Sequence, residues 1–150
     1  MVTTGVRSNG LWDGMAYWSS APGGALLYVH GSNDVLKSFQ FSGVTFGTTP
    51  VAQSAVTRPF PGGVLAVSSN GSTPGVMWAT TPAAPTNKAT AAGTLRAFDP
   101  LTLAELWDSD QNSARDTLGT FSKFSAPTVF NGKVYVATFS NQVVVYGLLP

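Results

Sequence analysis

The chain has 150 residues, of which 43% are hydrophobic and 10% charged, with a formal net charge of +1 and no cysteine. This is enough apolar material for one packed domain, and the low charge density excludes a nucleic-acid partner bound through a basic patch. The absence of cysteine excludes disulfides and thiolate metal sites. The longest apolar run, residues 143–149, is far shorter than the roughly 18 residues of a membrane-spanning helix, so we expect no membrane partner.

Short segments rich in Val, Thr, Tyr, Trp and Phe lie between the 16 glycines and 10 prolines. These residue types favour strands. No window shows a sustained helical pattern, and residues 101–107 would form two turns at most. We therefore expect an all-β protein. In chain order, the predicted strands are residues 15–18, 27–29, 34–39, 51–54, 64–67, 77–79, 93–98, 105–108, 127–130, 134–136 and 141–146.

The predicted strands fall into three copies of one pattern. Tyr28 and Phe39 are eleven residues apart in the first copy, and Tyr135 and Tyr146 repeat this spacing in the third. The second copy has the same hairpin with a loop insertion at residues 81–87. A strand precedes each hairpin, and a fourth strand follows it in the first two copies. The repeated unit is a four-stranded antiparallel meander of about 50 residues, which is typical of a propeller blade.

The third copy has an incomplete set of strands. Its first two strands are joined by Asn131-Gly132, which favours a tight type I′ turn. No fourth strand follows, but residues 10–13 match residues 105–108 at three consecutive positions. We therefore predict a single partial β-propeller over residues 1–150, whose third blade is completed by residues 10–13. The predicted blades span residues 14–56, 63–110 and 125–149.

An arc of three blades leaves two apolar sheet faces uncovered, which soluble monomers rarely tolerate. Closed propellers have 4 to 8 blades, so two chains with three blades each fit this range. We therefore expect a homodimer that closes a six-bladed ring. In this ring residues 10–13 of each chain complete the third blade of the other, and Trp12 is buried against the partner chain.

Several segments resemble the repeats of pyrroloquinoline-quinone-type, or quinoprotein dehydrogenase-like, β-propellers. These are residues 93–99 with 106–107, and residues 126–129 with 132–138. Residues 145–150 resemble the C-terminus of large bacterial proteins in that group. The resemblance implies the C-terminal three-blade portion of a fold that usually closes about seven or eight blades.

The cofactor of that family is not expected in this chain. The quinone enzymes are known for a vicinal cysteine pair and for a set of Glu, Asn and Asp residues that holds calcium beside the cofactor. This sequence has no cysteine and no recognisable set of that kind. Asp108 and Asp110 alternate at a strand end, but two carboxylates without a third predict no metal site.

The N-terminal residues give little information on the compartment. Residues 1–10 lack the charged and apolar regions of a secretory signal, so the chain as given is expected to be cytosolic or part of something longer. A longer parent protein could be periplasmic or secreted.

His30 is the single histidine of the chain, and it lies two residues after Tyr28 on a predicted strand. Both side chains are therefore expected on the same face. His30 could act as a general base, but no acidic partner is apparent nearby in the sequence. A partly buried histidine between two blades is the favoured interpretation.

Charged residues occur in the connections between the predicted blades, which in propellers lie at the mouth of the central channel. A ring of these residues would be net positive and could hold a small anionic ligand. The alternative to ligand binding is that Arg115 and Asp116 pair with each other or cap their loop. The candidate ligand-binding residues are Asp13, Arg58, Arg115, Asp116 and Lys123.

Two functions are consistent with these residues. The first is a self-assembling propeller module with a ligand-binding central channel. The second is a small hydrolase acting on an anionic or ester substrate at the channel mouth, with Asp116 or His30 moving protons and Arg58, Arg115 and Lys123 orienting charge. The sequence has no nucleophile-elbow, phosphate-loop or metal-type histidine motif, which favours the first function and leaves open whether the protein is an enzyme.

Overall fold

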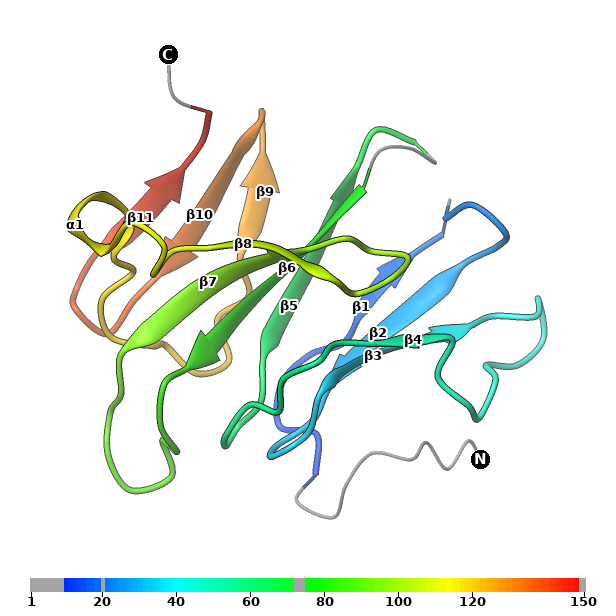
Figure 1. Ribbon diagram of the computed structural model, residues 1–150, viewed down its shortest axis with the longest axis horizontal. Helices are drawn as coiled ribbons and strands as arrows, with labels where there is room; N and C mark the ends of the chain where they lie inside the picture. Colours follow the sequence, from blue (N-terminus) through cyan, green and yellow to red (C-terminus); the bar gives the residue numbers. More distant parts are fainter. Residues whose placement is uncertain (1–9, 20, 72–74, 149–150) are drawn as a thin grey trace.

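The structure is a computed structural model that describes residues 10–19, 21–71 and 75–148. It contains three antiparallel sheets (Figure 1). The first sheet consists of β1 (Ala16–Trp18), β2 (Leu26–His30), β3 (Leu36–Gln40) and β4 (Ala52–Gln53). The second consists of β5 (Val64–Ser69), β6 (Gly75–Pro82), β7 (Gly93–Phe98) and β8 (Glu105–Asp108). The third consists of β9 (Thr128–Phe130), β10 (Lys133–Ala137) and β11 (Val143–Tyr146).

Within each sheet the strands lie in sequence order, so each sheet is a meander. The predicted all-β class and the eleven predicted strands are confirmed. The turn between β9 and β10 has φ values of 48° at Asn131 and 71° at Gly132, as a type I′ turn requires. A four-residue helix, α1 (Ser113–Asp116), lies between β8 and β9 and was not predicted. No helix in the described ranges is long and apolar enough to cross a bilayer.

The three sheets share one register. The central aromatic residue of the second strand is Tyr28 in the first sheet, Trp78 in the second and Tyr135 in the third. Equal register places these three side chains on the same face of their sheets, because side chains alternate along a strand. We call this the forward face, and the opposite face, which carries Leu27, Met77 and Val134, the rear face. The cross-strand partners are Ala16 and Ser38 for Tyr28, Ala66 and Ala97 for Trp78, and Thr128 and Val145 for Tyr135.

The sheets stack with forward face on rear face. Tyr28 of the first sheet packs in one core cluster with Met77 and Phe98 of the second. Trp78 of the second sheet packs against a cluster that contains Val134 and Val136 of the third. Strand β5 contacts both β1 and β9, so the first strands of the three sheets lie side by side, and their arrows point the same way in Figure 1. The middle sheet is therefore covered on both faces.

A buried hydrogen bond links the first two sheets. The hydroxyl of Tyr28 donates to the backbone carbonyl of Pro100, at 2.9 Å, in the turn between β7 and β8. Burial is the main reason that the pKa of Tyr28 lies above its ordinary value, and the nearby charge of Asp99 adds to it. Tyr28 thus holds the first sheet against the second both by apolar packing and by a hydrogen bond.

We expect Tyr28→Phe to reduce the free energy of unfolding by about 1–2 kcal/mol, because the variant leaves the buried Pro100 carbonyl without its donor. Urea unfolding followed by circular dichroism measures the effect. The matched control is Tyr17→Phe, whose side chain is 49% exposed on the opposite face of the same sheet, and it should change stability by less than about 0.5 kcal/mol. Equal effects in the two variants would contradict the assignment of Tyr28.

Candidate functional site

Residues 10–13 lie at the end of the stack where β1, β5 and β9 begin, which we call the mouth end (Figure 1). They form no strand within this single chain, and their pairing with the third blade of a second chain stays a prediction. The Trp12 ring packs edge-on against Phe60 at 5.3 Å and is 53% exposed. The backbone N–H of Phe124 donates to Asp13 Oδ1 at 3.0 Å. The segment therefore contacts the connections that lead into the second and third sheets of its own chain.

Asp13 and Lys123 both belong to the mouth end but do not pair with each other. Burial raises the pKa of the Asp13 carboxyl, and the hydrogen bond from Phe124 partly opposes the change. The other carboxylate oxygen of Asp13 is buried without a hydrogen-bond partner among the described residues. Lys123 Nζ donates to the carbonyl of Thr86 at 2.8 Å. The ammonium thus holds the β6–β7 loop.

Arg115 and Asp116 lie on α1 and pair with each other. Arg115 donates from Nε and Nη2 to the two carboxylate oxygens of Asp116, at 2.6 Å in both cases. These bonds raise the pKa of Arg115 and lower that of Asp116. The Asp116 backbone carbonyl also accepts a bond from Tyr146, at 2.9 Å. Of the two interpretations of this pair, mutual pairing is the one seen in the structure.

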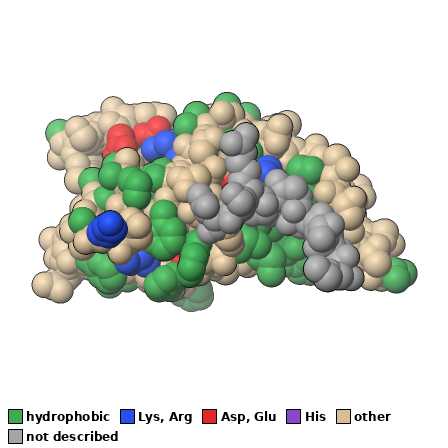
Figure 2. Space-filling model, turned by 90° about the horizontal axis from the view of Figure 1, so that it is seen from below, with side chains coloured by type: hydrophobic (Ala, Val, Ile, Leu, Met, Phe, Trp, Pro, Cys, Tyr) green, Lys and Arg blue, Asp and Glu red, His purple; other side chains and the backbone are tan. Residues whose placement is uncertain are grey.

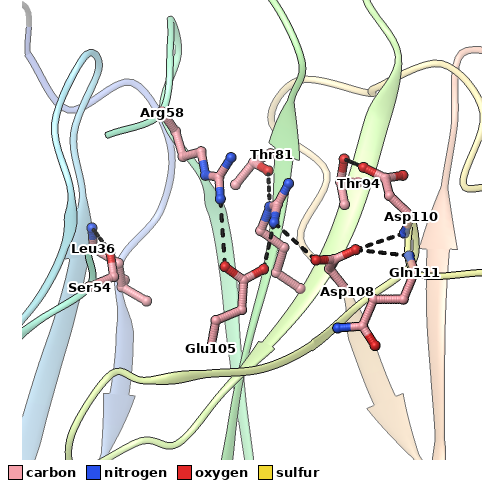
Figure 3. Close-up of polar contacts among 10 residues, drawn as sticks. Leu36, Ser54, Arg58, Thr81, Thr94, Glu105, Asp108, Asp110 and Gln111 are labelled. Carbon is pink, nitrogen blue, oxygen red and sulfur yellow. Dashed lines mark hydrogen bonds and ion pairs between the residues drawn. The ribbon is translucent and has the colours of Figure 1, made fainter. Parts of the chain in front are cut away.

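Arg58 belongs to a charge cluster between the first two sheets, made up of Arg58, Arg96, Glu105 and Asp108 (Figure 3). Arg96 Nη1 lies 2.5 Å from Glu105 Oε1 and 3.5 Å from Asp108 Oδ2. Arg58 Nη2 is 3.6 Å from Glu105 Oε2. Burial lowers the pKa of Arg58, and the charge of Arg96 acts in the same direction. Within this cluster the distance from Arg58 to Glu105 is therefore longer than that from Arg96 to Glu105.

His30 lies on the forward face at the end of β2 and is 4% exposed. It lines a cavity of about 280 Å³ together with Arg58 and Glu105. Neither ring nitrogen has a hydrogen-bond partner of normal geometry in the described part of the chain. Burial lowers the pKa of His30 to about 4, and Arg58 contributes to the shift, whereas the backbone and the charge of Asp34 oppose it. The imidazole is therefore neutral at ordinary pH.

The glycine before β5 makes room for this histidine. A Cβ atom at Gly63 would lie 2.3 Å from His30 Nδ1, closer than any real contact allows. The backbone of Gly63 thus stands directly against one edge of the imidazole, and a larger residue would displace the ring.

A second cavity, of about 440 Å³, lies between the second and third sheets. Its walls include Trp78, Trp107 and Tyr146, with the Arg115–Asp116 pair beside them. The Trp107 and Tyr146 rings meet edge-on at 5.8 Å. These aromatic residues pack between the second and third sheets.

The five predicted ligand-binding residues do not form one ring in this chain. Asp13 and Lys123 are at the mouth end, Arg58 lines the His30 cavity, and Arg115 and Asp116 line the aromatic cavity. Figure 2 views the mouth end, where basic side chains are scattered over the described surface. The structure instead brings together His30 and Arg58, which the sequence had treated as separate candidates.

Sequence reasoning missed Arg96 and Glu105. Both lie on predicted strands, and the register places Arg96 directly opposite Asp108. Cross-strand pairing of opposite charges was thus the available signal.

The forward face of the third sheet is an exposed apolar surface. Its residues Phe130 and Val145 are 71% and 49% exposed, and Val143 is also exposed. Tyr135 lies among them and is half-buried. No described sheet covers this face, which we call the open forward face. The edge of β11 is also unpaired among the described residues, since β11 pairs with β10 alone.

Comparison with protein-family models, with curated proteins and with solved structures gives no match to this chain. Within the described ranges, no group of three or more His, Asp or Glu side chains is placed to hold a metal ion. The features of the described residues that bear on function are the cavity beside His30 and the open forward face.

We expect His30→Gln to remove a stability loss that the wild-type protein shows between about pH 7 and pH 4. The folded-state pKa of about 4 is below the ordinary value of 6.5, so the unfolded chain binds more protons in this range. Stability therefore falls as the pH is lowered, by up to about 3 kcal/mol in total.

Urea unfolding of both proteins at several pH values tests this. The carboxylates are common to the two proteins, so their contribution cancels in the difference between the curves. Parallel curves from pH 7 to pH 4 would contradict the burial of a neutral His30.

Proposed function

We propose that this chain is a self-assembling, quinoprotein-like β-propeller module, and that a second copy covers its open forward face to close a six-bladed ring. The observation that carries the proposal is the position of Tyr135. Its equivalents Tyr28 and Trp78 each pack against a following sheet of the same chain. Tyr135 has the same register but no following sheet in the described residues.

The surface that fits this face is the rear face of the first sheet. Rear faces already receive forward faces twice in the chain, through Met77 in the second sheet and Val134 in the third. The first sheet presents Tyr17 and Leu27 at the equivalent register. A second copy supplies this surface, and two head-to-tail contacts of the same kind complete a closed ring with a two-fold axis.

Ring closure requires local movement at the first sheet. The Tyr17 ring packs edge-on against Phe46 of the β3–β4 loop at 6.4 Å, and Phe39 of the rear face is buried. The loop that carries Phe46 must therefore shift when the third sheet of another chain docks. The docking sheet would then take the place that Phe46 holds against Tyr17.

The unpaired edge of β11 accommodates residues 10–13 of the second copy. In the second sheet, Trp107 of the fourth strand pairs with Ala97 of the third. Val145 is the register equivalent of Ala97, so Trp12 in trans pairs with Val145 and extends the open forward face. Residues 10–13 exchange their contacts with Phe60 and Phe124 of their own chain for this strand.

In the assembled ring, β1, β5 and β9 line a central channel, and Lys123 lies near its mouth as a candidate for a small anionic ligand, whereas Asp13 lies in the outer strand. The hydrolase alternative has no comparable support. Asp116 is held in an ion pair with Arg115, and His30 has no hydrogen-bonded nucleophile among the described residues.

We expect the wild-type protein to have the mass of a dimer in multi-angle light scattering at micromolar concentration. Val145→Lys places a charge on the open forward face and should give a monomer with an unchanged circular dichroism spectrum, because Val145 is exposed in the single chain. The matched control Leu106→Lys, at an exposed position of the second sheet, should remain a dimer, because both faces of that sheet are covered within the chain. A wild-type monomer would overturn the proposal.

A mixing experiment separates the head-to-tail ring from a dimer that pairs two open forward faces. We expect Tyr17→Lys to be monomeric as well, because it alters the rear face of the first sheet. An equimolar mixture of the Val145→Lys and Tyr17→Lys chains should recover heterodimers, since one contact between them remains intact. If Tyr17→Lys alone is a full dimer, the ring arrangement is wrong.

A further inference from the structure

We propose that the cavity beside His30 binds a small organic carboxylate with a short apolar body, held by Arg58 and by the imidazole N–H of His30. The cavity lies between the first and second sheets, whereas self-assembly uses the third sheet and the opposite face of the first. The proposal is therefore independent of the proposed function.

The first support is the state of the His30 side chain. A neutral imidazole carries one N–H donor and one acceptor, and buried polar groups of this kind are nearly always hydrogen-bonded. Here neither nitrogen has a hydrogen-bond partner of normal geometry among the described residues, although the ring is almost fully buried and the backbone of Asp34 lies near enough to raise the imidazole pKa. Because Nδ1 stands against the backbone of Gly63, Nε2 is the nitrogen that we assign to the ligand.

The second support is the loose pairing of Arg58. Its side chain is 17% exposed, and its contact of 3.6 Å with Glu105 is longer than a hydrogen bond. Arg96 holds the other oxygen of Glu105 at 2.5 Å, so that carboxylate pairs more closely with Arg96 than with Arg58. Arg58 therefore keeps N–H groups that can bind a carboxylate in the two-pronged manner typical of arginine.

The surroundings select among anions. The negative charges of Glu105, Asp108 and Asp110 act on Arg58 and would repel a doubly charged phosphate more strongly than a singly charged carboxylate. The cavity is also lined by Val56, Phe98 and Leu103, which suit a hydrocarbon body. A carboxylate with a short aliphatic chain satisfies both the charge and the apolar walls.

The test is an NMR titration with sodium butyrate, with inorganic phosphate and 1-butanol as comparison probes. His30 is the single histidine of the chain, so its ring resonances are unambiguous. Butyrate should shift these resonances in a saturable manner, together with the backbone amides of residues 53–56 and 102–105. Phosphate should bind at least about tenfold more weakly than butyrate, because it carries more negative charge. 1-Butanol should also bind at least about tenfold more weakly, because it has no charge to pair with Arg58.

Arg58→Gln should weaken butyrate binding by at least about tenfold, and His30→Gln should weaken it by less, because a charged partner contributes more than a neutral one. The control Arg115→Gln, at an exposed arginine on α1, should bind butyrate like the wild type. If Arg58→Gln does not fold, the wild-type shift map decides by itself.

Three results would overturn the carboxylate site. They are shifts confined to residues outside the cavity, binding of phosphate as tight as that of butyrate, and wild-type affinity in a folded Arg58→Gln variant. Val145→Lys should bind butyrate normally, and Arg58→Gln should still assemble. Failure of either proposal is thereby distinguished from failure of the other.

Discussion

The common register of the three meanders is the constraint on which the rest of the structure depends. It places Tyr28, Trp78 and Tyr135 at equivalent positions, so that every sheet presents one face forward and one face to the rear. Contact between unlike faces then builds the stack without further instruction, because each interface uses the same geometry. A slip of one residue in any sheet would exchange its two faces and remove every contact that those faces make with a neighbouring sheet.

The same register also positions the polar features between the first two sheets. His30 follows Tyr28 by two residues and therefore points toward the second sheet, at a level where Gly63 leaves space for its ring. Arg96 stands opposite Asp108 for the same reason, and it draws Glu105 away from Arg58. The buried His30 imidazole and the Arg58 guanidinium thus share one cavity because the first two meanders are aligned in this register.

The strands and their grouping could be predicted because the spacing of Tyr28 and Phe39 recurs in the third copy, and strand pairing follows from such local repeats. The side chains of the connections could not be placed in this way. Arg58 turns toward Glu105, and Arg115 pairs with its sequence neighbour, because loop geometry is set by contacts that no periodicity reports. Helix α1 is likewise too short to leave a periodic pattern. Strand exchange between chains stays a prediction.

The hydrogen bond from Phe124 to Asp13 joins residues that are 111 positions apart. Nearly every other link in the stack connects a strand to its neighbour in sequence or a sheet to the next sheet, and so closes a shorter loop of chain than the Asp13 link does. The Asp13 link encloses the first two sheets, because all of their strands lie between its two residues in the chain. We therefore expect it to form later in folding than the contacts within those sheets, and to be absent while the second sheet is still emerging from the ribosome.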